Sequence, residues 1–423
     1  MPGRFPLASW RARLQRIQFR LQVQRELTCV LKKYIPERGN RPLFLTPDRP
    51  IPPTGVDPPI GRQEELMKRI VVCADGTWNM RDQLDESTGK RRPTNVTKLA
   101  RAVLPRAGNG VDQIVFYDEG VGTSGGLDKL TGGAFGRGIE RNVRDIYRFL
   151  SYNYEAGDEI FLFGFSRGAF TVRTLAGFMN RVGLLGKGDD YYVPDVYAAY
   201  ESDEKPGSAR WEQIFHNVKQ RRECPSIRMI GVWDTVGSLG APGLLGRVVN
   251  RDKYQYHDIA LNRHVENAIH ALAIDEQRSP FAPDLWKRPA GWQGQLEQAW
   301  FAGVHSNIGG GYTPDGLANE ALHWVIEKAE ALGLRFDANY LEFFAPVFYS
   351  ELKDSMTVTY RAMGRNVREI GAHAADGESV HQSAVDRYND AGCAYRPDNL
   401  KRYIDSGQAR IVGTTRIERG RKP

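Results

Sequence analysis

Residues 160–169 read Ile-Phe-Leu-Phe-Gly-Phe-Ser-Arg-Gly-Ala, and this stretch decides the fold of the chain. The four apolar residues at its start predict a short buried strand, and the small Ala169 at its end opens a segment with helical spacing. Between them lies a G-x-S-x-G pattern, in which Gly164 and Gly168 flank Ser166. A serine at a sharp strand-to-helix turn has strained backbone angles, and glycine two residues away avoids a clash. The stretch therefore predicts a nucleophile elbow, with the serine hydroxyl projecting above a sheet.

Strands and helices alternate on both sides of this stretch. Short apolar runs predict further strands at residues 70–74, 114–117, 227–233 and 299–304, and segments of helical spacing separate them. Parallel strands need crossover connections, which helices usually provide. The alternation therefore predicts an α/β fold of the α/β-hydrolase type, with a mostly parallel sheet and helices on both of its faces.

Charge and composition divide the chain into an extension, residues 1–66, and a catalytic domain, residues 67–423. The net charge is +7, yet residues 1–35 alone hold eight Lys or Arg and one acid, so the rest balances at 50 basic and 50 acidic residues. Residues 10–21 have the spacing of a basic amphipathic helix, and residues 36–64 are rich in Pro and Gly. We expect a poorly ordered extension, with peripheral membrane contact as its alternative role. The neutral remainder argues against a nucleic-acid partner.

Cysteine usage and hydropathy narrow the cellular context. The four cysteines lie far apart without a CxxC pair, so neither a disulfide framework nor a metal cluster is expected. No run of 18 apolar residues occurs, and residues 1–35 lack the apolar core of a signal peptide. We therefore expect a cytoplasmic protein that needs no metal or other cofactor. Whether the protein is exported stays open, as does the oligomeric state.

Two residues downstream of the elbow complete a candidate triad. A serine hydroxyl needs a base that takes its proton and a carboxylate that orients this base. In α/β-hydrolases these residues follow in the order Ser, Asp or Glu, His. Asp234 directly follows one predicted strand, and His305 follows the next, at the same sheet edge as Ser166. We predict that these three residues are catalytic, and Asp275 is the main alternative for the acid.

The developing oxyanion needs backbone N–H donors. The residue after the nucleophile, Arg167, supplies one. We expect the second from the turn after the first strand, at the amide of Gly76 or Thr77, with the loop of residues 120–123 as the alternative. Residues 132–138 are also rich in glycine, but they follow no strand directly and lack the G-K-[ST] ending of a phosphate-binding loop.

An aromatic-rich segment, about residues 235–297, separates the strand of Asp234 from the strand of His305. We expect it to form a cap insertion, because it interrupts the sheet at the edge where ligands bind. His264 and His270 fall in a stretch of this segment that we expect to be helical, where they would be surface or packing residues.

Six motifs together resemble the catalytic domain of the type VI secretion phospholipase effectors, a family with many bacterial and fungal members. The motifs are V-C-A-D-G-T-W-N (72–79), T-N-V (94–96), Y-D-E-G-V-G-T (117–123), G-F-S-R-G-A (164–169), V-W-D-T-V-G (232–237) and A-G-V-H-S-N-I-G-G-G-Y (302–312). The resemblance spans about residues 67–400. It implies an α/β-hydrolase fold, a triad at Ser166, Asp234 and His305, and hydrolysis of phospholipid esters. The sequence departs from the family pattern at Asn307, where an acidic residue is common.

These observations predict a serine-dependent carboxylic ester hydrolase that acts on phospholipids or other lipid esters. Two alternatives stay open at this point. One is an esterase for small soluble or polyester substrates, and the other is a binding protein that keeps the fold without the reaction.

Overall fold

The computed structural model of the chain describes most of the predicted catalytic domain. The described residues are 67–76, 79, 82, 84, 89–120, 132–202, 204–236, 260–362 and 364–415. They belong to one compact unit, Glu64–Pro423. The predicted extension and residues 237–259 of the predicted cap lie outside them. In these ranges, no helix combines the length and the apolar character that crossing a membrane requires.

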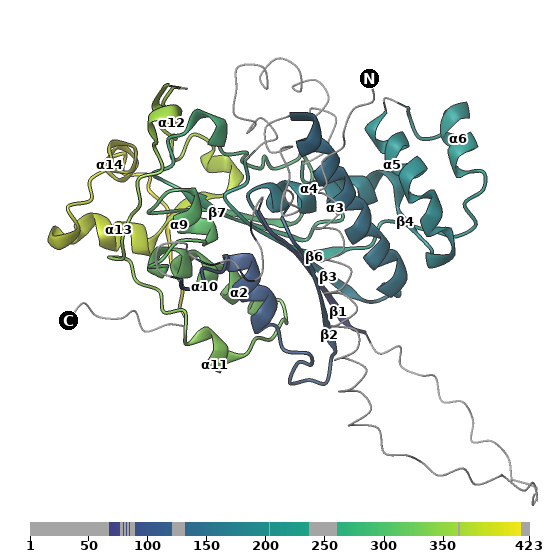
Figure 1. Cartoon of the computed structure of the whole chain (residues 1–423), viewed down its shortest axis with the longest axis horizontal. Helices are drawn as coiled ribbons and strands as arrows, with labels where there is room; N and C mark the ends of the chain where they lie inside the picture. Colours follow the sequence, from purple (N-terminus) through teal and green to yellow (C-terminus); the bar gives the residue numbers. More distant parts are fainter. Residues whose placement is uncertain are drawn as a thin grey trace, which may run out of the picture. The chain divides into compact units, whose positions relative to one another are not determined.

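An eight-stranded sheet forms the centre of this unit (Figure 1). The strand order is β10-β9-β8-β7-β6-β3-β1-β2, and every neighbouring pair is parallel. The strands are β1 (Arg69–Ala74), β2 (Gln113–Asp118), β3 (Glu159–Phe165), β6 (Ile227–Trp233), β7 (Asn267–Ala273), β8 (Gln295–Phe301), β9 (Glu378–His381) and β10 (Ile411–Val412). The predicted α/β class and its mostly parallel sheet are therefore confirmed.

Helices cover both faces of the sheet (Figure 1). One face packs against α3 (Gly132–Asn153), α4 (Arg167–Val182) and α5 (Val193–Glu201). The other packs against α2 (Asn95–Ala102), α9 (His305–Gly309) and α10 (Gly316–Ala331). Strand β1 shows the consequence, since Ile70 and Val72 face the first layer while Val71 and Cys73 face the second. A strand covered on both faces reads as a continuous apolar run, which is the pattern that the sequence displays.

Smaller elements complete the unit at its two ends. A short antiparallel pair, β4 and β5, lies beside α6, and a third core cluster joins the β8–β9 end of the sheet to α13 and α14. These and the remaining elements are β4 (Leu184–Leu185), η2 (Lys187–Tyr192), α6 (Ala209–Phe215), β5 (Arg221–Arg222), η3 (Ser279–Phe281), α11 (Ala338–Leu341), α12 (Val358–Ala362), η4 (Ala374–Asp376), α13 (Gln382–Asn389), η5 (Ala391–Cys393) and α14 (Asp398–Asp405).

Strand β7 corrects the predicted cap. Residues 267–273 lie in the sheet between β6 and β8, whereas we expected the whole segment 235–297 to be an insertion outside it. The strand reads Asn-Ala-Ile-His-Ala-Leu-Ala, and alanine and leucine favour helices, so its local pattern predicted a helix. Burial on both faces overrides this preference, and His270 is accordingly an interior residue with no exposed surface.

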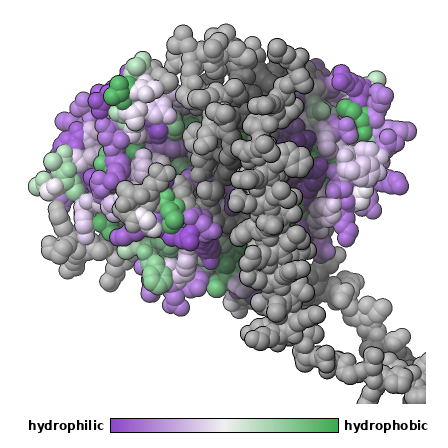
Figure 2. Space-filling model, viewed as in Figure 1, coloured by the Kyte–Doolittle hydropathy of each residue, from purple (hydrophilic) through white to green (hydrophobic). Residues whose placement is uncertain are grey.

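The face seen in Figure 2 is mainly hydrophilic or intermediate in hydropathy over the described residues. Its hydrophobic areas are small and separated from one another (Figure 2). Among the described residues, Val358 and Phe343 are the most exposed large apolar side chains, with 85% and 82% of their surface accessible. Scattered apolar residues of this kind are ordinary on protein surfaces, so they do not by themselves indicate a docking surface.

Candidate active site

Ser166 lies at the turn from β3 to α4, where the G-x-S-x-G pattern predicts it. Its φ of 56° and ψ of −117° are values that residues with a side chain rarely adopt. The backbone around it is fixed, because the Ser166 amide donates to the Trp233 carbonyl (3.0 Å) and the Ser166 carbonyl accepts from the Phe170 amide (3.2 Å). Strained backbone angles that the surrounding structure holds in place occur mainly at functional sites.

The glycines on either side of the serine are required by close packing. A Cβ atom on Gly168 would lie 2.0 Å from the carbonyl oxygen of Ala74 in β1. A Cβ atom on Gly164 would lie 2.5 Å from the carbonyl oxygen of Gly168. Both obstacles are backbone atoms of packed elements and cannot rotate away, so only glycine fits at these two positions.

Asp234 and His305 form a close pair beside this turn. Nδ1 of His305 lies 2.6 Å from Oδ2 of Asp234, and both side chains are buried. Asp234 follows β6 and has a φ of 39°, and among the described residues only Ser166, Asp234 and Ala394 combine a side chain with a positive φ. Two of these three strained positions were therefore singled out from the sequence.

His305 does not directly follow a strand, although the sequence predicted a strand at residues 299–304 immediately before it. Strand β8 ends at Phe301, and His305 is the first residue of α9 after a short connection. The prediction placed the residue at the correct edge of the sheet but on the wrong element. A five-residue helix is too short to leave a clear periodic pattern in the sequence.

Aromatic rings on two sides hold the imidazole of His305. The ring of Phe165 lies 4.7 Å from it and the ring of Phe281 lies 5.0 Å from it, measured between ring centroids. Phe165 directly precedes Ser166 in the chain, and the Ser166 amide bonds the residue directly before Asp234. The elbow and the Asp–His pair are therefore joined by packing on one side and by a backbone hydrogen bond on the other.

Asp234 has strong donors on both of its oxygens. Oδ1 accepts from the Ala273 amide (3.0 Å) and from Nη1 of Arg368 (2.6 Å), and Nη2 of Arg368 donates to Oδ2 (3.1 Å). Burial alone would raise the pKa of this carboxyl, but the charges and hydrogen bonds of Arg368 and His305 lower it below its ordinary value. Asp234 therefore stays ionised inside the protein. The sequence analysis did not identify Arg368.

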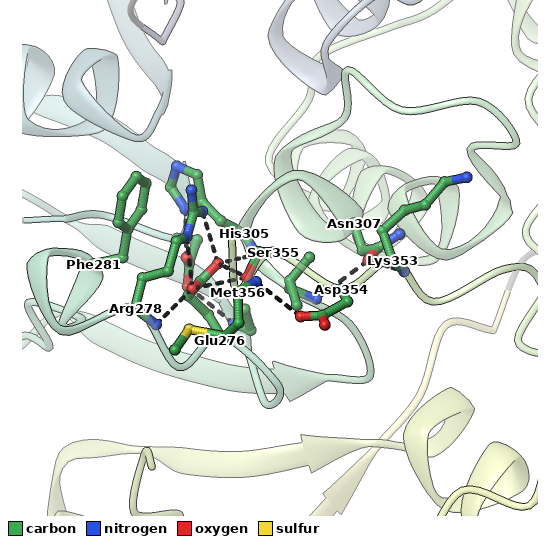
Figure 3. A network of polar contacts seen from close by, with 12 residues as sticks. Glu276, Arg278, Phe281, His305, Asn307, Lys353, Asp354, Ser355 and Met356 are labelled. Carbon is green, nitrogen blue, oxygen red and sulfur yellow. Dashed lines mark hydrogen bonds and ion pairs between the residues drawn. The ribbon is translucent and has the colours of Figure 1, made fainter. Parts of the chain in front are cut away.

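Glu276 is a second buried acid that the sequence analysis missed. Its Oε2 accepts from the backbone amide of His305 (3.2 Å), Arg278 donates to both oxygens (2.8 and 2.9 Å), and the Ser355 hydroxyl donates as well. Figure 3 shows these contacts converging on Glu276 beside His305 and Phe281. Glu276 follows β7, so recognition of that strand would have placed its carboxylate at the sheet edge of the other candidates.

Asp275, the alternative acid, contacts other groups. Its Oδ2 accepts from the Gly303 amide (2.6 Å) and from the Tyr395 hydroxyl (2.9 Å). Burial raises the pKa of Asp275 to about 6, although two hydrogen bonds act against that shift. Asp275 therefore supports the connection that leads to His305, while Asp234 is the carboxylate bonded to the imidazole.

The turn after β1 lies beside the serine. A Cβ atom on Gly76 would lie 3.3 Å from the Cβ of Ser166. The Gly76 amide already donates to Oδ1 of Asp75 (2.7 Å), which disfavours it as the second oxyanion donor. Thr77 and residues 121–123 lie outside the described residues. Arg167 is the first residue of α4 and directly follows Ser166.

Metal-binding side chains do not gather in the ranges that the structure describes. No group of three or more His, Cys, Asp or Glu residues there could hold an ion. Burial raises the pKa of the Cys73 thiol, so this cysteine stays protonated and is a poor nucleophile.

Comparisons with known proteins identify a family for this chain. A family model described as "T6SS, Phospholipase effector Tle1-like, catalytic domain" matches residues 68–328, which is more than half of the chain. "Uncharacterized protein YEL023C" from Saccharomyces cerevisiae is 30% identical over 235 residues, which are 51% of this chain and 32% of that protein. The chain thus spans about a third of that relative's length.

Two solved structures are similar at a low level. An uncharacterized protein from Pseudomonas aeruginosa has a TM-score of 0.39 at 16% identity, over 70% of this chain and 48% of that chain. The Tle1 effector bound to the VgrG spike has a TM-score of 0.35 at 17% identity, over 59% of this chain and 52% of that chain.

Proposed function

We propose that this chain, which belongs to the Tle1-like family of type VI secretion phospholipase effectors, is a serine hydrolase of lipid esters. In this proposal Ser166 is the nucleophile, His305 the general base and Asp234 the residue that orients the base. The observation that carries it is the 2.6 Å contact between Nδ1 of His305 and Oδ2 of Asp234, beside a strained serine turn.

The first half of the proposed reaction forms an acyl-enzyme. The ionised Asp234 accepts a hydrogen bond from Nδ1–H of His305, which keeps the proton on Nδ1 and leaves Nε2 able to accept a proton. Nε2 takes the proton of the Ser166 hydroxyl as Oγ attacks the ester carbonyl carbon. The tetrahedral intermediate then collapses, and the imidazolium gives its proton to the departing alcohol oxygen.

The second half returns the enzyme to its starting state. A water molecule gives a proton to Nε2 of His305 and attacks the acyl carbon. The second tetrahedral intermediate expels Oγ of Ser166, which recovers its proton from the imidazolium as the carboxylic acid leaves. Every proton that His305 accepts is returned within the cycle, so no co-reactant other than water is needed.

Backbone dipoles support the stabilisation of the intermediate. Helix α4 spans 16 residues and begins directly after Ser166, so its positive end lies where oxyanion charge develops. The Arg167 amide is the first donor in this proposal. The second donor stays a prediction, at Thr77 or at the loop of residues 120–123.

The lipid part of the proposal depends on family membership, because a triad alone does not select its ester. A phospholipid offers two acyl ester bonds of the kind that this mechanism cleaves. A soluble short-chain ester presents the same carbonyl chemistry without a lipid surface. The two substrate classes can therefore be separated only by assay.

A fluorophosphonate probe and a phospholipid vesicle assay test the two parts. We expect covalent labelling of the wild-type protein and release of fatty acid from phosphatidylglycerol–phosphatidylethanolamine vesicles, measured by mass spectrometry. Ser166→Ala removes the nucleophile, so both signals should disappear. Ser226→Ala, which changes a serine bonded to Glu266 on the surface, should keep both.

Equal labelling or equal turnover in Ser166→Ala and the wild type would contradict the serine mechanism. Labelling with cleavage of p-nitrophenyl butyrate, but no fatty acid release from vesicles, would keep the mechanism and exclude the lipid substrate. Absence of both activities in a folded wild-type protein would favour the non-catalytic alternative.

A further inference from the structure

Arg368 lies outside the part of the chain that matches the family model, yet it reaches the candidate triad. The family match ends at residue 328, and Arg368 follows α12 in the segment that leads to β9. Only 1% of its side chain is exposed. A buried arginine is costly unless acceptors satisfy its charge, so its contacts indicate why it is there.

The guanidinium of Arg368 joins three elements. It donates to both oxygens of Asp234 (2.6 and 3.1 Å), to the Ala273 carbonyl at the end of β7 (2.8 Å) and to the Phe281 carbonyl in η3 (2.7 Å). The ring of Phe281 in turn packs against the His305 imidazole at 5.0 Å. One side chain therefore contacts the acid directly and the base through an aromatic ring.

The geometry of the pair makes the contact specific. A guanidinium is planar and presents two parallel N–H groups, so a bidentate contact fixes the plane of the carboxylate as well as its distance. With the Ala273 amide and Nδ1 of His305, the two oxygens of Asp234 have four close polar partners. A carboxylate held in this way cannot rotate away from the imidazole.

We propose that Arg368 is a positioning residue for the hydrolysis reaction, which holds the Asp234 carboxylate in the plane and charge state that orient His305 toward Ser166. The inference rests on the proposed function. It also means that the segment beyond residue 328 completes the active site and is not an appendage to it.

Charge gives this role a measurable consequence. Among the described residues, the ionisable groups that interact with Asp234 are His305 from α9, Arg368 from the segment after α12 and His270 from β7. Burial lowers the pKa of His270 to about 3, so its imidazole is neutral at the pH values of the assays. Without Arg368, the rise that burial causes in the pKa of Asp234 would be opposed mainly by the contact with His305. The pKa of Asp234 would then rise, and its protonated form would no longer carry the negative charge that strengthens the hydrogen bond from Nδ1–H and stabilises the imidazolium.

Three variants test the inference in the full-length chain. Arg368→Met removes the charge and keeps the length, Arg368→Lys keeps the charge without the fork, and Arg387→Met is the matched control. Arg387 is a buried arginine of the same C-terminal region, and it donates to the Phe348 and Ser350 carbonyls and not to the triad.

Steady-state kinetics on a soluble ester give the first readout. We expect Arg368→Met to lower kcat by roughly tenfold to a hundredfold with little change in KM, the size of loss seen when outer partners of metal ligands are removed. The acidic limb of its kcat profile should move to higher pH. Arg368→Lys should return the acidic limb of the profile to its wild-type position and recover only part of kcat. A wild-type kcat and pH profile in Arg368→Met, or an equal loss in Arg387→Met, would overturn the inference.

Proton NMR gives a readout that needs no activity. The proton between Nδ1 of His305 and Oδ2 of Asp234 should resonate far downfield, and His305→Asn identifies it by its loss. We expect Arg368→Met to shift or abolish this resonance and Arg387→Met to retain it. An unchanged resonance in Arg368→Met overturns the positioning role. If Arg368→Met changes this resonance but the wild-type protein has no ester activity, the proposed function is refuted, and the contact between Arg368 and the Asp234–His305 pair is supported.

Discussion

The two sides of the candidate active site are held by different kinds of contact. On the serine side, β1, β3 and α4 meet so closely that Gly168 has no room for a Cβ atom. On the histidine side, buried ion pairs hold the residues, with Arg368 on Asp234 and Arg278 on Glu276. Backbone packing defines the first side, and side-chain charge defines the second.

This difference predicts how each side should respond to substitution. The elbow glycines pack against atoms of their own turn and of the neighbouring strand β1. Asp234 pairs with Arg368, and Glu276 pairs with Arg278 and accepts from the Ser355 hydroxyl. The serine side should therefore fail abruptly when a single atom is added, and the histidine side should fail by degrees as charges are removed.

The largest effect on the fold is expected from Gly168→Ala. The new Cβ would lie 2.0 Å from the Ala74 oxygen, so β1 and α4 must separate, at a cost of about 3 kcal/mol or more in the free energy of unfolding. Thermal unfolding and fluorophosphonate labelling would measure it. Gly188→Ala is the control, because a Cβ there meets nothing within 4 Å. If Gly168→Ala unfolds and labels like the wild type, backbone packing does not define the serine side.

The next effect is expected from Asp234→Asn on the histidine side. An amide cannot hold the imidazole in the required tautomer, and the same change in a serine protease triad lowers kcat roughly 10⁴-fold. Asp275→Asn is the matched control, since Asp275 bonds the Gly303 amide and its pKa is already raised to about 6. We expect the kcat of this control to stay within about tenfold of the wild type. Similar losses in the two variants would return Asp275 to consideration as the acid.

The smallest effect is expected from Glu276→Gln. A glutamine keeps the shape and an acceptor for the His305 amide, but it loses the charge that pairs with Arg278. We expect a loss of about 2 kcal/mol in the free energy of unfolding and a smaller loss of kcat than in Asp234→Asn. Chemical denaturation measures the first quantity. Glu297→Gln removes the more exposed pair with Lys328 and should change stability by less than about 1 kcal/mol. Equal losses of stability in the two variants would mean that the buried Glu276–Arg278 pair contributes no more than the more exposed Glu297–Lys328 pair.

The parts of this site that could be predicted are those with a local signature. The elbow occupies ten consecutive residues, and Asp234 directly follows an apolar run, so both are visible in the sequence. Strand β7 was missed because its alanine-rich sequence has a helical preference that only burial overrides. Because β7 was missed, the position of Glu276 just after it was missed as well. Arg368 has no motif at all, since nothing near it in the sequence distinguishes it from other arginines.

The sequence by itself determined the α/β class, the sharp turn at Ser166 and the approximate sheet edge of Asp234 and His305. It could do so because steric limits and hydrophobic periodicity act between neighbours in the chain. The tertiary structure decided which buried charges meet, namely Arg368 with Asp234 and Glu276 with the amide of His305. Partners of this kind are chosen by the folded arrangement of distant segments, because a charge is stable in the interior only where an opposite charge or a donor has been brought to it.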